Sequence, residues 1–164
     1  MLLFFNAPIE REEKKREIEG VEVVNTISRA LELRIVNPFV LWQFISKYLM
    51  SKIFCIYVIT KNDICIHTSM VIGKGWRFPF MSNDDIQIGP CWTATESRKQ
   101  GLYVAIIQRI LCDFSDHQCW MICDENNIAS IRGIERAGLE LRAKGKRTMP
   151  VGFKIIGRFV ITKV

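Results

Sequence analysis

The hydrophobic pattern changes near Lys52 from a helical period to the two-residue period of strands, and this change limits the folds open to the chain. Residues 54–60 are β-branched and aromatic, residues 61–63 (Lys-Asn-Asp) form a turn sequence, and residues 64–72 resume the strand pattern, which predicts a β-hairpin. Further strands are predicted at 85–93, 119–123, 139–143 and 153–162, with helices at 101–113 and 127–137. This order predicts an α/β (α+β) fold whose mixed, mostly antiparallel sheet has about six to seven strands and is flanked by helices.

The first fifty residues predict two helices and one strand. Residues 10–19 place opposite charges three and four positions apart among good helix formers, which predicts a surface helix. Residues 21–36 alternate irregularly, as in a strand with one buried face. The pair Asn37-Pro38 has the residue types of an N-cap and a first helical position, and residues 39–49 continue at helical spacing.

The length of 164 residues suits one domain, residues 1–164, with a core of its own. The longest uncharged apolar stretch, residues 53–60, is far shorter than the roughly 20 residues that cross a bilayer. Residues 1–5 are apolar but lack the basic start of a secretory signal. We therefore expect a cytoplasmic protein that has no membrane partner and is a monomer or a homodimer.

The cysteines and histidines do not suggest a metal site. No pair of the six cysteines has the two-residue spacing of zinc knuckles, and only His67 and His117 supply imidazole. We expect reduced, buried cysteines and no metal.

The net charge of +6 lies in the carboxy-terminal part of the chain. Residues 1–97 hold 11 basic and 11 acidic side chains, whereas residues 98–164 hold 12 basic and 6 acidic ones. Such an excess suits a polyanionic partner, either nucleic acid or a small ligand with several phosphates, and it also suits a solvated surface that keeps the protein soluble.

One segment joins a predicted strand to the start of a predicted helix. Residues 93–103 read Thr-Ala-Thr-Glu-Ser-Arg-Lys-Gln-Gly-Leu-Tyr. The first N–H groups of a helix have no partners within it, so they can hold a phosphate. Gly101 lets the backbone approach an anion, and Arg98 and Lys99 add positive charge. An ordinary strand-to-helix turn has the same composition.

A second segment opens the next predicted helix. Asn127 follows a strand and has the residue type of an N-cap, and its amide could also contact a ligand. Gly138 has the place of a glycine that ends the helix. The interrupted strand 85–93 contains Gly89-Pro90, a pair that marks a bulge or a splayed edge.

Together, Arg-x-x-Gly ending at Gly101 and Asn-x-x-Ser-(x)7-Gly-Leu beginning at Asn127 resemble the GCN5-related N-acetyltransferase (GNAT) family over about residues 86–143. The resemblance implies the acyl coenzyme A N-acyltransferase fold, in which the fourth and fifth strands splay apart to admit acetyl coenzyme A. It also implies which residues bind that cofactor. These are Cys91, Trp92 and Thr93 on the strand; Arg98, Lys99, Gln100, Gly101, Leu102 and Tyr103 in the diphosphate loop; and Asn127 with Ser130.

Two positions depart from the family pattern. Tyr103 stands where the loop usually ends in glycine or alanine, which puts a bulky ring beside the phosphate site. Ile134 stands seven residues after Asn127, where the family often has a tyrosine that acts as general acid. An alkyl side chain cannot return a proton to the coenzyme A thiolate.

Amine acetylation also needs a base within reach of the nucleophile. The candidates are His67, Asp84, Asp85 and Glu96. We predict His67 as the catalytic base because it titrates near neutral pH, with Asp85 as the second choice. A packed strand histidine and a turn aspartate are the ordinary alternatives.

Residues 75–81 (Gly-Trp-Arg-Phe-Pro-Phe-Met) are too apolar to be wholly exposed. Three interpretations remain open: a packed loop, a wall of an acceptor pocket where Trp76 or Phe78 stacks on a ring, or a protein interface.

The expected function is an acyltransferase that moves an acetyl group from acetyl coenzyme A to a primary amine, such as an amino sugar or another small amine. The alternative is a catalytically degenerate acyl coenzyme A binding protein with a regulatory or structural role. A basic nucleic-acid-binding module ranks third, because the interleaved aromatics of single-strand binders are missing, so no nucleic acid partner is expected.

Overall fold

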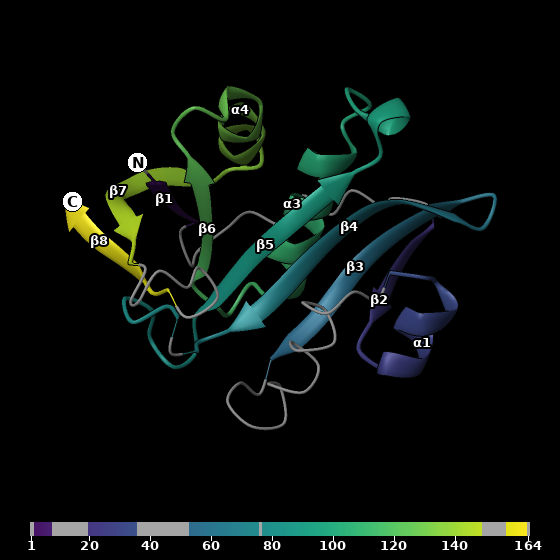
Figure 1. Ribbon diagram of the computed structural model, residues 1–164, viewed down its shortest axis with the longest axis horizontal. Coiled ribbons are helices and arrows are strands. Elements are labelled where there is room, and N and C mark those ends of the chain that lie inside the picture. Colours follow the sequence, from purple (N-terminus) through teal and green to yellow (C-terminus); the bar gives the residue numbers. More distant parts are fainter. Residues whose placement is uncertain (1, 8–19, 36–52, 76, 149–156, 164) are drawn as a thin grey trace.

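The computed structural model describes residues 2–7, 20–35, 53–75, 77–148 and 157–163 (Figure 1). One eight-stranded sheet has the order β2-β3-β4-β5-β6-β1-β7-β8. The strands are β1 (Leu2–Ala7), β2 (Val21–Val24), β3 (Phe54–Lys61), β4 (Ile64–Gly73), β5 (Ile86–Thr93), β6 (Cys119–Asp124), β7 (Glu140–Arg147) and β8 (Phe159–Lys163). The helices are α1 (Ile27–Glu32), the short 3₁₀ helix η1 (Thr95–Ser97), α3 (Leu102–Asp113) and α4 (Ile128–Arg136). Within these residues, no helix is long and apolar enough to cross a membrane.

The predicted mixed, mostly antiparallel sheet is confirmed. The hairpin β3–β4 pairs Phe54 with Ile72 and Lys61 with Ile64, and β4 continues antiparallel to β5. Only β5 and β6 run parallel. The strands and helices predicted between residues 85 and 137 all lie within about two residues of their expected bounds, whereas the strand predicted at 139–143 continues four residues further, to Arg147.

The amino-terminal strand β1 was not predicted. With it the sheet has eight strands, whereas we expected six or seven. It lies between β6 and β7 and is antiparallel to both. Both of its faces are buried: Phe5 belongs to the core beneath α3 and α4, while Phe4 packs against Phe80 on the other face. A strand buried on both faces shows no polar and apolar alternation, so the periodicity of residues 2–7 gave no sign of it.

The strand predicted over residues 21–36 is wrong beyond Val24. Thr26 caps α1, because its side chain accepts a hydrogen bond from the backbone N–H of Arg29. Arg29 also pairs with Glu22 and Glu32, which holds this short helix against β2. Leu31, which we expected on a buried strand face, is an exposed residue of α1. The helices predicted at 10–19 and from Asn37, and the first residues of the strand predicted from Phe153, lie largely or wholly outside the described residues.

Helices cover both faces of the sheet. Alternate residues of β3 belong to two separate cores: Tyr57 and Ile59 pack in the core shared with α3 and α4, and Ile56 and Val58 pack in the core shared with α1. The predicted bulge is present, because the register between β4 and β5 shifts between Ser69 and Val71, opposite Gly89-Pro90. This bond is a cis peptide.

The strands β5 and β6 part almost as soon as they pair. Their register contains only Ile86 with Cys119 and Gln87 with Trp120. Figure 1 shows the two strands diverging from this common start, with α4 above the end of β6. The splay that the resemblance implied between the fourth and fifth strands is found here between β5 and β6.

Tyr103 in the first turn of α3 reaches across to α4. Its hydroxyl lies 3.0 Å from Ser130 Oγ, and its ring packs on Gly133 so closely that a Cβ there would lie 2.6 Å from two ring carbons. A residue with a side chain would therefore collide with the Tyr103 ring at position 133, so glycine is required there. The contact joins α3 and α4, the two helices that border the gap between β5 and β6.

His67 on β4 is fully buried beside that gap. Its Nδ1 lies 2.8 Å from Thr93 Oγ1 on β5, and its Nε2 lies 2.9 Å from Ser69 Oγ. A neutral imidazole satisfies both contacts, because one nitrogen donates and the other accepts. Burial lowers the pKa of His67 to about 4.

The first prediction concerns His67 and acid stability. Its pKa is about 4 when folded and 6.5 in the reference state, so the unfolded chain binds the proton more readily between these values. The free energy of unfolding should therefore fall as pH drops from about 6.5 to 4, by up to about 3 kcal/mol from this residue. His67→Gln should lack this contribution, so urea unfolding of both proteins at pH 7 and pH 4 should show the variant losing less stability. Equal losses would contradict the buried neutral imidazole.

The second prediction concerns the contact of Tyr103 with Gly133. Gly133→Ala should destabilise the protein by about 1–3 kcal/mol, because the ring must move. In a Tyr103→Ala background the same change should instead stabilise by about 0.5–1 kcal/mol, since alanine favours a helix interior over glycine. Chemical denaturation of the four proteins measures this double-mutant cycle. An unchanged sign would contradict the contact.

Candidate functional site

A cavity of about 1210 Å³ occupies the gap between β5 and β6. It passes through the sheet. Leu102, Tyr103 and Gly133 line it on the helical face, and Gln87, Ile122 and Phe78 line it on the opposite face. The faces follow from the alternation along β6, where Met121 and Cys123 belong to the core beneath α3 and α4 and the intervening Ile122 faces away.

The loop before α3 lies at one mouth of the cavity. Gly101 is the N-cap residue, in a left-handed conformation with φ of 82° that glycine adopts without steric cost. The first N–H with a helical partner is that of Ala105, which donates to Gly101 O at 3.0 Å. The preceding amides of the first turn are therefore available to an anion. Arg98 Nε donates to Thr93 O at 3.2 Å, which holds its side chain beside the end of β5.

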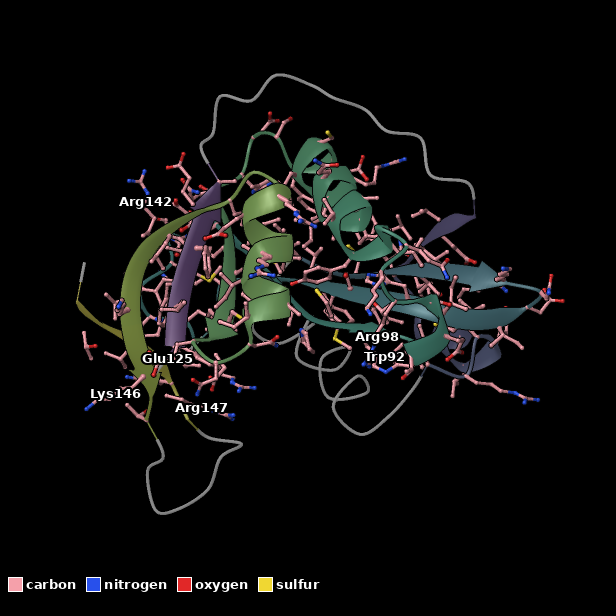
Figure 2. All side chains as sticks on the ribbon, turned by 90° about the horizontal axis from the view of Figure 1, so that it is seen from above. Trp92, Arg98, Glu125, Arg142, Lys146 and Arg147 are labelled. Atoms are coloured by element: carbon pink, nitrogen blue, oxygen red, sulfur yellow. The ribbon has the colours of Figure 1, made fainter. Side chains whose placement is uncertain are left out.

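Five of the six residues predicted for the diphosphate loop line the cavity. These are Arg98, Lys99, Gly101, Leu102 and Tyr103. Gln100 is not among the lining residues, and its side chain donates to Glu96 O at 3.2 Å. Figure 2 shows Trp92 and Arg98 close together beside this loop.

The strand residues Cys91, Trp92 and Thr93 also line the cavity. Because the pairing of β5 with β6 ends at Gln87, β6 does not occupy the hydrogen-bonding edge of these residues. The side chain of Trp92 is 50% exposed, which is unusual for a residue of this size. Burial raises the pKa of the Cys91 thiol to about 11, so the thiol is neutral at physiological pH.

The other wall comes from the start of α4. Asn127 Oδ1 accepts a hydrogen bond from the Ser130 N–H at 3.2 Å, so the predicted capping role is confirmed. Both residues line the cavity, and Ser130 Oγ lies 3.0 Å from the Tyr103 hydroxyl. The bulky ring at position 103 is accommodated by Gly133, and burial raises the pKa of its phenol.

The predicted catalytic residues do not line the cavity. His67 is buried in the sheet, where it contacts the hydroxyl of the cavity-lining Thr93 and its ring lies 6.4 Å, between centroids, from that of the cavity-lining Tyr103. Asp85 accepts hydrogen bonds from the Ser82 N–H and from Trp120 Nε1, both at 2.9 Å, which anchor the loop before β5. The catalytic roles of these two residues remain predictions. Ile134 is fully buried in the core beneath α3 and α4.

The weaker base candidates also lie away from the cavity. Asp84 and Glu96 are exposed, and neither is among the lining residues. Within the described part of the chain, no three His, Cys, Asp or Glu side chains come together as a metal site would require. None of the six cysteines, all of which the structure describes, forms a disulfide, and Cys55, Cys119 and Cys123 are buried.

The cavity is strongly cationic, and sequence reasoning missed several of its residues. The lining cations are Arg77, Arg98, Lys99, Arg132 and Arg136, against the single carboxylate of Asp124. Arg132 and Arg136 could have been found from their spacing of four on the predicted helix. Arg77 and Phe159 could not, because nothing local shows that a loop and the last strand meet at the gap.

Gly75 and residues 77–81 belong to a packed loop that also forms a cavity wall. The buried Phe78 lines the cavity, and Phe80 packs against both Phe4 and Trp120 with ring centroids 5.1 Å apart. The interpretation as a packed loop is therefore confirmed, and an acceptor pocket at this wall stays a prediction. Trp76, the other residue expected to stack on a ligand, lies outside the described residues.

No family model matches the sequence, and no curated protein is significantly similar to it. Solved structures are similar in fold. A putative GNAT-family acetyltransferase from Novosphingobium aromaticivorans has a TM-score of 0.60 and 14% identity, over 86% of this chain and 59% of that one. A GNAT-family acetyltransferase from Colwellia psychrerythraea also has a TM-score of 0.60, with 11% identity over 85% of this chain and 52% of its own.

A GCN5-related N-acetyltransferase from Sphaerobacter thermophilus is similar to the same extent, with a TM-score of 0.60 and 13% identity over 86% of this chain and 48% of its own. The chain thus spans between about half and three-fifths of the length of these proteins. We conclude that the chain has the fold of the GCN5-related N-acetyltransferases.

Proposed function

We propose that the chain is an N-acetyltransferase that moves an acetyl group from acetyl coenzyme A to a primary amine by direct transfer. One observation carries the proposal: β5 and β6 part after two residue pairs, and the gap opens into a cavity that passes through the sheet beside the start of α3. A long, narrow, polyanionic thioester fits such a passage, because its phosphates need cations and free amides at one mouth.

The residues present suit that ligand. The first-turn amides of α3, with Arg98 and Lys99, would hold the diphosphate. The open edge of β5 at Cys91 to Thr93 would pair with the amide groups of the pantetheine arm, as an added strand does. Asn127 and Ser130 would face the arm from α4.

Bound acetyl coenzyme A would supply the acetyl thioester: a bond forms between the amine nitrogen and the acetyl carbon while the carbon–sulfur bond breaks and the sulfur keeps its electron pair. A backbone N–H of β5 would stabilise the negative charge that develops on the carbonyl oxygen. Ile134 is apolar and buried, so it gives no proton to the sulfur. The thiolate can leave unprotonated, because a thiol pKa lies not far above neutrality.

The amine must also lose a proton. His67 is neutral at physiological pH because of its lowered pKa, and it contacts the cavity-lining Thr93 hydroxyl. A proton could therefore pass from the amine through Thr93 to His67. Asp85 is the second candidate, although Ser82 and Trp120 already use its carboxylate.

A second function is favoured by one observation. Ile134 leaves α4 without a phenol, and His67 has hydroxyl partners on both ring nitrogens. A protein that binds an acyl coenzyme A without turnover, as a regulatory or structural element, would need neither acid nor base.

The third prediction tests the binding site. Gly101→Glu should weaken acetyl coenzyme A binding at least about 10-fold, because it puts a carboxylate beside the free amides and strains a positive φ. Gly138→Glu is a matched control: it also has a positive φ, of 102°, and open space around its Cβ, but it does not line the cavity. Calorimetric titration of both variants should show loss of affinity in the first alone, and equal affinities would reject the site.

The fourth prediction separates the two functions. An acetyltransferase should release free thiol from acetyl coenzyme A when a panel of primary amines, including amino sugars, is added, and the rate should depend on amine concentration. Thiol release is followed with a colorimetric reagent, and a reaction without amine is the control. Calorimetric binding of acetyl coenzyme A without release for any amine would favour the non-catalytic function.

A further inference from the structure

Arg77 lies on the face of the sheet opposite α3 and α4, where an acceptor would approach the gap. It precedes Phe78 and Phe80 in a loop that packs under this face, since Phe80 contacts Phe4 and Trp120. The main chain of this loop is tied to β8, because the Phe159 N–H donates to Arg77 O at 2.8 Å. Arg77, Phe78 and Phe159 all line the cavity. The position of Arg77 at the cavity wall is therefore fixed by tertiary contacts.

The aromatic ring of Phe159 organises the charges at this end. Phe78 stacks on it with a centroid distance of 5.4 Å and an interplanar angle of 11°. The guanidinium carbons of Arg77 and Arg147 both lie 5.5 Å from its centroid. Two cations thus share one ring, which gathers positive charge at this wall of a cavity where, among the described residues, Asp124 is the one lining carboxylate.

Among the residues that the structure describes, Arg77 has no counterion. Its Nε is buried and has no hydrogen-bond acceptor among the described residues, and no carboxylate of these residues forms a salt bridge with it. Burial and the charge of Arg147 both lower its pKa from the ordinary value, which is the signature of a cation held without an anion. A buried unpaired donor is costly in a folded protein, and a guanidinium fork fits a carboxylate or phosphate.

The phosphates of acetyl coenzyme A are unsuited to this role. Arg77 comes from the segment before β5, whereas Arg98 and the start of α3 follow it. The eight residues of β5 separate these segments by about 26 Å of extended chain, at roughly 3.3 Å per residue. The diphosphate would be held beyond one end of this strand, so a different anion is needed beyond the other.

We propose that Arg77, beside Phe159, is an anion-binding subsite for the acceptor, so that the preferred acceptor is a primary amine that also carries a carboxylate or a phosphate. This inference rests on the proposed acetyltransferase function. It narrows the acceptor from amines in general to anionic amines, and it makes Arg77 a specificity-determining residue.

The experiment compares matched acceptors in a thiol-release assay. β-Alanine is paired with propylamine, and O-phosphoethanolamine with ethanolamine, so each pair differs by the anionic group. The wild-type protein should prefer an anionic member at least about 10-fold in kcat/KM, mainly through KM, because charge-assisted hydrogen bonds to a guanidinium have that strength. The pair with the larger preference tells carboxylate from phosphate. No preference in either pair would overturn the inference.

Three variants locate the effect. Arg77→Gln should reduce the preference to about onefold, mainly by raising KM for the anionic amine, whereas Arg77→Lys should keep part of it. Lys146→Gln removes one exposed cation from β7, outside the cavity (Figure 2), and should keep the full preference. Thermal melting checks that each variant is folded. A preference that survives in folded Arg77→Gln would overturn the proposal.

Binding separates failure of the subsite from failure of the proposed function. β-Alanine and O-phosphoethanolamine are titrated by calorimetry into wild type and Arg77→Gln, with coenzyme A present and absent. Saturable binding that is lost in Arg77→Gln supports the subsite even if no amine is acetylated. Absence of binding by both compounds, while acetyl coenzyme A still binds and neutral amines still turn over, overturns the subsite and leaves the acetyltransferase function intact.

Discussion

The structure depends on the early end of pairing between β5 and β6. A sheet normally satisfies each strand with its neighbours, but here only Ile86 and Gln87 of β5 pair with β6. The helices α3 and α4 border the gap on one face and are joined by Tyr103 against Gly133. The loop anchored by Asp85, with the aromatic ring of Phe78, borders the gap on the other face. A passage through the sheet is the result, and every candidate functional residue is placed relative to it.

The charge of the passage follows from the segments that meet there. Arg98 and Lys99 come from the loop before α3, Arg132 and Arg136 from α4, and Arg77 from the loop before β5. Because Asp124 is the one lining carboxylate in the described part of the chain, these five cations make the cavity favourable to anions. Part of the carboxy-terminal excess of positive charge therefore lies around this cavity. That excess is partly concentrated in a site and is not only spread over a solvated surface.

The two departures from the family pattern have different structural consequences. The ring of Tyr103 packs against Gly133 on the neighbouring helix, where no side chain stands in its way. This contact joins α3 to α4. Ile134, in contrast, fills the hydrophobic core and offers no ionisable group. In the proposed acetyl transfer Ile134 would take no part in moving a proton, and the hydroxyl of Thr93 beside His67 is a connection that the sheet provides.

Local patterns were sufficient for the hairpin, for α3 and α4, for the bulge at Gly89-Pro90 and for the loop around Gly101, because turns, caps and helical periods involve residues close in sequence. The sequence by itself thus determined a mixed sheet and a helix, α3, whose first-turn amides are available to an anion. Only the tertiary structure decided that residues 2–7 form an inner strand, that His67 is sealed between two hydroxyls, and that Arg77 meets Phe159 at the gap. Those outcomes depend on contacts between residues up to 136 positions apart, such as Asn6 with Arg142, and no local period encodes which distant segments come together.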